Sequence, residues 1–264
     1  MARLTGPLAF TGKLDGISAF KRKGSNRVIL RPRYGPSKKD VDTKPSYDNT
    51  RRVNKEFGGR STAAKWIRDG YHALKLIADS DNLSNLNALL LPIQQLDTET
   101  EYGKRSVILS LNRGLLEGFN LNKWHPFESV IQNPVGCTVL REELKALVNV
   151  PALIKGVNFI PPTVHPFFRV VAALSIVPDL YYHQVRYRPI GSYEGFRPGV
   201  VKTAWMAVHT QTEAINLELT LPAIPPNDHF SLVLTMGIEM GTAKSLSLIE
   251  GIKYAGCGKI MAVR

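Results

Sequence analysis

The residues best suited to chemistry are cations and aromatic rings, which alternate along the first quarter of the chain. Residues 1–70 hold 17 Lys and Arg against 6 Asp and Glu, whereas residues 71–264 hold 17 against 16. Cations neutralise phosphates because binding releases condensed counterions, and rings stack on unpaired bases. We therefore expect non-specific binding of nucleic acid, with single-stranded RNA as the expected form. The predicted phosphate-binding residues are Arg22, Arg27, Arg31, Arg33, Arg51, Arg52 and Lys55.

Two other interpretations of this basic segment remain open. The positive charge could serve solubility only, or it could pair with an acidic patch on a neighbouring subunit. Among the interleaved rings, Phe20 and Trp66 are better suited to a hydrophobic core than to base stacking, and Tyr34 or Tyr47 could attach the segment to a neighbour. The sequence contains no recognised RNA- or DNA-binding module.

Motifs of enzyme chemistry are missing from the sequence. The six histidines form no H-E-x-x-H pair, and neither Cys137 nor Cys257 belongs to a C-x-x-C. The glycine-containing segment 237–245 lacks the spacing of a phosphate-binding loop. We therefore predict no catalytic residue, no cofactor, no metal ligand and no small-molecule substrate, and we do not expect an enzyme. Both cysteines are expected to be small buried residues.

The expected compartment is the cytoplasm, and release from it without a cleaved signal is the alternative. No apolar run reaches 18 residues, and the N-terminal segment lacks the apolar core of a signal peptide. We therefore expect no membrane partner.

The basic segment is predicted to contain a small β-meander, within a first region that spans residues 1–60. Short apolar runs in residues 6–33 are separated by turn residues at 14–16 and 23–26. Residues 34–60 are punctuated by proline and glycine and are expected to form an extended arm. Because so small a sheet is marginally stable alone, it should pack on its own subunit or on another.

The next regions are predicted to be helical (61–120) and transitional (121–163). Ser61 is a good N-cap for a first helix. A second helix should run from Ser80 or Asp81 to about Leu96, with a kink at Pro92. Residues 107–111 are also expected to be helical. Short strands are expected near 138–140 and 146–150.

The last region, residues 164–264, is predicted to be an antiparallel β-sandwich of the jelly-roll or Greek-key kind. It is rich in β-branched and aromatic residues, and residues 216–221 alternate between polar and apolar side chains. The resulting fold class is α+β, with a basic N-terminal meander and arm, a short helical segment and a C-terminal sandwich. The seven expected strands are 167–177, 181–187, 200–209, 215–221, 229–240, 246–253 and 258–263.

Three segments of the sequence, residues 4–18, 50–58 and 234–240, resemble a family of uncharacterised proteins of similar length from the Bacteroidota. The resemblance implies a bacterial source. Its motifs are structural, and the family has no established activity, so no functional residue is inferred from it.

Two functional hypotheses follow. The first is a structural subunit that self-assembles into a homo-oligomeric tube, filament or shell and binds nucleic acid through its basic arm. The alternative is a soluble nucleic-acid- or ribosome-associated protein that does not form large assemblies.

Overall fold

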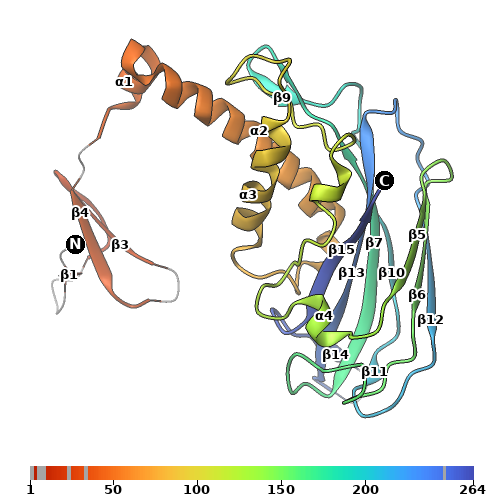
Figure 1. The fold of residues 1–264 in the computed structure, drawn as a ribbon. Helices are drawn as coiled ribbons and strands as arrows, with labels where there is room; N and C mark the ends of the chain where they lie inside the picture. The colour runs from red at the N-terminus through yellow and green to blue at the C-terminus, as the bar shows by residue number, and fades with distance from the viewer. Residues whose placement is uncertain (1–2, 5–9, 23–24, 33–34, 246–247) are drawn as a thin grey trace. The chain divides into compact units, whose positions relative to one another are not determined.

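The computed structural model describes residues 3–4, 10–22, 25–32, 35–245 and 248–264 (Figure 1). The chain forms two compact units, Met1–Arg51 and Arg52–Arg264. It combines helices with antiparallel sheets, which confirms the predicted α+β class.

The N-terminal unit contains a four-stranded antiparallel sheet in the order β1-β4-β3-β2. The strands are β1 (Arg3–Leu4), β2 (Gly12–Leu14), β3 (Ile17–Lys21) and β4 (Val28–Pro32). Asp15 has a φ of 46°, so the Asp-Gly pair makes the tight turn that the sequence predicts between β2 and β3. The predicted meander is therefore confirmed, although Leu8, Ala9, Lys23 and Gly24 lie outside the described residues.

The extended arm predicted for residues 34–60 is wrong, because most of this segment is helical. It contains α1 (Lys38–Thr43), a short 3-10 helix η1 (Pro45–Tyr47) and the first half of α2 (Asp48–Gly70). Ser37 and Asp40 form a capping box that starts α1, and Pro45 occupies the first turn of η1, where its missing N–H costs nothing. Ser61 consequently lies inside α2 and is not its N-cap.

Close packing explains one of the two adjacent glycines inside α2. A Cβ on Gly59 would lie 2.7 Å from the Tyr187 ring, so only glycine allows this contact between α2 and the rest of the second unit. Gly59, which was counted as evidence for an extended arm, therefore allows α2 to pack closely.

Four shorter helices follow α2: η2 (His72–Leu74), α3 (Asn82–Gln95), η3 (Arg113–Leu115) and α4 (Phe127–Val130). The predicted second helix is confirmed as α3, which includes Pro92. The helix expected over residues 107–111 is wrong. Val107 instead exchanges two backbone hydrogen bonds with Leu180, and the Ser110 amide donates to the Asp179 carboxylate. These distant acceptors replace the bonds that a local helix would make.

The second unit contains two main antiparallel sheets. A six-stranded sheet has β7 and β13 at its centre; β10 and β11 pair with β7, and β14 and β15 pair with β13. A three-stranded sheet has the order β12-β6-β5, and β8 and β9 form a separate hairpin. The strands are β5 (Gly136–Leu140), β6 (Lys145–Val150), β7 (Phe167–Pro178), β8 (Tyr181–His183), β9 (Arg186–Arg188), β10 (Gly199–Lys202), β11 (Met206–Ala207), β12 (Ile215–Thr220), β13 (Phe230–Ala243), β14 (Ile249–Gly251) and β15 (Cys257–Val263).

The predicted sandwich-like arrangement is confirmed, with differences in detail. The strands expected near 138–140 and 146–150 are β5 and β6, and they supply most of the smaller sheet. The expected strands 181–187 and 200–209 are each divided into two short strands. Leu246 and Ser247, at the start of another expected strand, lie outside the described residues.

The second unit has three layers. The side chains of β7 that face the smaller sheet, including Phe168 and Val170, join one core cluster. Those on the opposite face, including Val171 and Ala173, join a second cluster with α2 and α3 (Figure 1). Because both faces of β7 are covered, its sequence is an almost continuous apolar run instead of an alternating one.

Candidate functional site

The strand register gives the N-terminal sheet one face that carries cations. Lys13 lies opposite Ser18, and Ser18 lies opposite Arg31, so a row of side chains crosses β2, β3 and β4. Phe20 lies opposite Ile29 on the same face, because side chains of directly opposed antiparallel residues point to the same side. Lys13 and Arg31 are exposed, and Phe20 is 37% exposed. We call Lys13, Ser18, Phe20, Ile29 and Arg31 the basic face.

The opposite side of the same sheet is mostly apolar, although it includes the exposed cation Lys21, which lies opposite Val28. Leu14 lies opposite Ile17, and Ala19 lies opposite Leu30. Leu14 and Ile17 remain 62% and 44% exposed, so this side offers uncovered apolar surface. We define the apolar face as Leu14, Ile17, Ala19, Val28, Leu30 and Pro32.

Three of the predicted phosphate-binding residues lie on this sheet or next to it. Arg31 is part of the basic face. Arg22 directly follows β3 and Arg27 directly precedes β4, and both are exposed. Arg33 lies outside the described residues. Lys13 was missed by the sequence analysis. Only the strand register places it in the same row as Arg31.

The other three predicted cations have different surroundings. The Arg51 guanidinium donates to the carbonyls of Val41 at 2.6 Å and Lys44 at 3.0 Å, so it caps the end of α1. Arg52 and Lys55 belong to the second unit and are not part of the basic face. The Lys55 ammonium is exposed and lies 6.0 Å from the centre of the Tyr182 ring.

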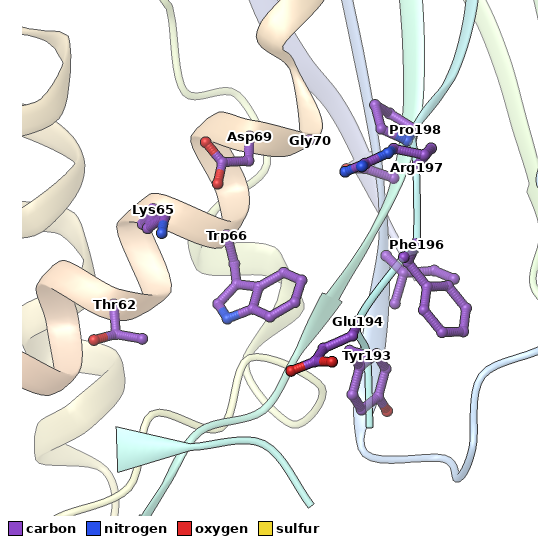
Figure 2. Close-up of a pocket in the computed structure, with 13 residues that line it drawn as sticks. Thr62, Lys65, Trp66, Asp69, Gly70, Tyr193, Glu194, Phe196, Arg197 and Pro198 are labelled. Atoms are coloured by element: carbon purple, nitrogen blue, oxygen red, sulfur yellow. The ribbon is translucent and has the colours of Figure 1, made fainter. Parts of the chain in front are cut away.

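A pocket of about 330 Å³ lies in the second unit beside α2, and the sequence analysis did not anticipate it (Figure 2). One wall is the face of α2 from Thr62 to Gly70, and the other is the segment 193–198 between β9 and β10. Figure 2 shows the Trp66 indole between the two walls. The Trp66 and Tyr193 rings are nearly perpendicular, at 76°, with centres 6.3 Å apart.

Charged side chains of both signs line this pocket. Lys65 and Asp69 lie on α2, and Glu194 and Arg197 lie on the opposite segment. All four are exposed. Within the described ranges, none of the four takes part in an ion pair.

A buried ion pair holds α2 to the segment that follows α3. Glu56 accepts two hydrogen bonds from the Arg105 guanidinium, both at 2.7 Å, and one from the Gly103 amide at 2.9 Å. Burial acts to raise the pKa of Glu56, but these hydrogen bonds and the charges of Arg105 and Arg60 outweigh it and hold that pKa below its usual value. This cluster is satisfied internally and supports the fold.

The described part of the chain contains no group of three or more His, Cys, Asp or Glu that could hold a metal ion. None of the helices that the structure describes is both long enough and apolar enough to cross a bilayer. No family model matches the chain, and comparisons with curated proteins and with solved structures find no match.

Proposed function

We propose that this protein is a structural subunit that assembles with copies of itself and binds nucleic acid without sequence preference. One observation carries the proposal: the register of the N-terminal sheet gives it one mostly apolar face and one basic face. A sheet with two such faces can pack against protein on one side and against phosphates on the other.

The apolar face supports self-assembly. Among the described residues of the N-terminal unit, only Ala19 and Val28 are buried hydrophobic side chains, so the sheet has little core of its own. Burying the parts of Leu14 and Ile17 that remain exposed would contribute about 1–2 kcal/mol each. A neighbouring copy can supply the cover, and a contact that does not close on itself repeats from copy to copy, as a large assembly requires.

The basic face supports binding of a single strand. Residues 1–51 contain 12 Lys and Arg against 4 Asp and Glu. On the face itself, Lys13 and Arg31 can contact phosphates while the exposed ring of Phe20 stacks on a base. None of these contacts distinguishes one base from another, so we expect no sequence preference.

Assembly is tested by making the apolar face polar. We compare the full-length protein with Leu14→Ser/Ile17→Ser by light scattering and negative-stain electron microscopy. Val185→Ser is the matched control, because Val185 is exposed on the second unit. We expect large particles for the wild type and the control, and single subunits with an unchanged circular dichroism spectrum for the double variant. A monomeric wild type, or a double variant that still assembles, contradicts the proposed assembly.

Nucleic-acid binding is tested by titrating a fluorescent oligouridine at several salt concentrations. Lys13→Gln/Arg31→Gln should flatten the plot of log affinity against log salt by about one to two units, because about 0.7 counterion is released per phosphate contact. Lys38→Gln/Lys39→Gln removes the same charge from exposed positions of α1 and should change the slope less. Phe20→Ala should weaken binding by about 1–3 kcal/mol without changing the slope.

Two results would count against the basic face. One is a wild type that does not bind at low salt, and the other is a control that loses as much as the double variant. Binding by a wild type that stays monomeric favours the alternative function, a nucleic-acid-binding protein that does not assemble.

A further inference from the structure

We propose that the pocket beside α2 binds a small zwitterionic ligand with an aromatic ring, of the α-amino-acid class. The pocket lies entirely in the second unit, so this inference goes beyond the proposed function and does not depend on the N-terminal sheet.

The charges of the two walls indicate the class of ligand. Each wall contributes one cation and one anion: Lys65 and Asp69 from α2, and Glu194 and Arg197 from the facing segment (Figure 2). An anionic ligand would face both carboxylates, and a cationic ligand would face Lys65 and Arg197. A zwitterion can pair with both signs at once, with its ammonium beside a carboxylate and its carboxylate beside a cation.

The indole of Trp66 supplies a surface for the ring of the ligand. Trp66 is partly buried and packs against both core clusters, so its position is fixed while one side borders the pocket (Figure 2). Among the described residues, its indole N–H has no hydrogen-bond partner. Phe196 adds a second partly buried ring to the lining. Aromatic rings in a pocket favour a ligand with a flat apolar part.

The size of the pocket and the stiffness of its walls fit a small ligand. Its volume of about 330 Å³ is near the lower end of the range for ligand sites, about 300–1,000 Å³. The α2 wall is packed closely, because a Cβ on Gly70 would lie 2.3 Å from the Ser175 hydroxyl. On the other wall, the Tyr193 hydroxyl donates to Asn227, whose side-chain amide donates to the Ile190 carbonyl. Walls held in place lower the entropic cost of binding.

The need for both charges is tested with three related probes on the full-length protein. L-phenylalanine carries an ammonium and a carboxylate, 2-phenylethylamine carries only the ammonium, and 3-phenylpropionate carries only the carboxylate. We expect isothermal titration calorimetry to show saturable binding of L-phenylalanine, with both analogues at least about tenfold weaker, because a hydrogen bond to a charged group contributes this much. No saturable binding of L-phenylalanine at millimolar concentrations overturns the proposal, as does equal binding of either analogue.

Variants assign the binding to this pocket. Glu194→Gln and Arg197→Gln should each weaken L-phenylalanine binding about tenfold. Both residues are exposed, so the fold should be unchanged, as circular dichroism will check. Glu213→Gln and Arg186→Gln are matched controls at exposed positions outside the pocket lining and should bind as the wild type does. Unchanged binding in both pocket variants places the ligand elsewhere and overturns the assignment.

Discussion

Removing the Arg105 side chain should destabilise the second unit more than any ordinary surface substitution. In Arg105→Met, Glu56 loses both hydrogen bonds from the guanidinium and keeps only the one from the Gly103 amide. The Glu56 side chain is 3% exposed, so water can replace the lost partner only in part. Methionine keeps most of the apolar stem of arginine, and the substitution therefore removes mainly the charge.

The expected loss is about 2–4 kcal/mol at pH 7. Breaking a buried ion pair from one side costs about 3–5 kcal/mol, because it leaves the other charge buried and uncompensated. We expect somewhat less here, since the Arg105 side chain is 18% exposed and water reaches this edge of the pair. The control Lys104→Met breaks an exposed ion pair with Glu101 and should cost less than about 1 kcal/mol.

The dependence on pH gives the prediction a second signature. In the wild type the pKa of Glu56 is lowered, so its contribution to stability is present above the unfolded value near 4.5 and is lost as the pH falls through the folded pKa. In Arg105→Met, burial and the Gly103 hydrogen bond remain while the Arg105 contribution is gone, so the pKa of Glu56 should rise from its wild-type value. The difference in stability between wild type and variant should therefore shrink as the pH falls from 7 to 4.

Urea unfolding at several pH values, followed by circular dichroism, measures both signatures. A loss below about 1 kcal/mol at pH 7 would refute the assignment of Glu56 and Arg105 as a stabilising buried pair. A loss that stays constant between pH 7 and pH 4 would refute the explanation through the Glu56 carboxylate.

Three further outcomes are expected. Gly59→Ala should lower the free energy of unfolding by about 1–3 kcal/mol, because its Cβ would lie 2.7 Å from the Tyr187 ring; equal melting temperatures for this variant and wild type would contradict that contact. Gly58→Ala, in the same helix with nothing within 4 Å of the new Cβ, should raise the free energy of unfolding by up to about 1 kcal/mol. A loss of stability in this variant would show that the new Cβ does meet a neighbour. Burial raises the pKa of the Cys137 thiol to about 11 and that of Cys257 to about 12, so iodoacetamide at pH 8 should label the unfolded chain much faster than the folded one; rapid labelling of folded Cys257 would argue against its burial.

The strands and the charge distribution could be predicted from the sequence because both are local properties. The continuous apolar run of β7 indicates a strand covered on both faces, and the alternation of β12 indicates a strand covered on one. The turn between β2 and β3 follows from the Asp-Gly pair, which tolerates a positive φ. The concentration of cations in the first 70 residues needs only counting.

The tertiary structure decided the features that depend on residues distant in the sequence. Gly59 was among the residues that predicted an extended arm, yet it lies inside α2. Glycine is needed there because the Tyr187 ring, from the β8–β9 hairpin, occupies the space of a side chain. Arg51 looked like a phosphate ligand, but its guanidinium is engaged by carbonyls at the end of α1. Lys13 and Arg31 become neighbours only through the strand register, and Trp66 and Glu194 meet only in the folded second unit. Local sequence sets the conformations that each segment can adopt, whereas long-range packing selects one of them and brings the sites together.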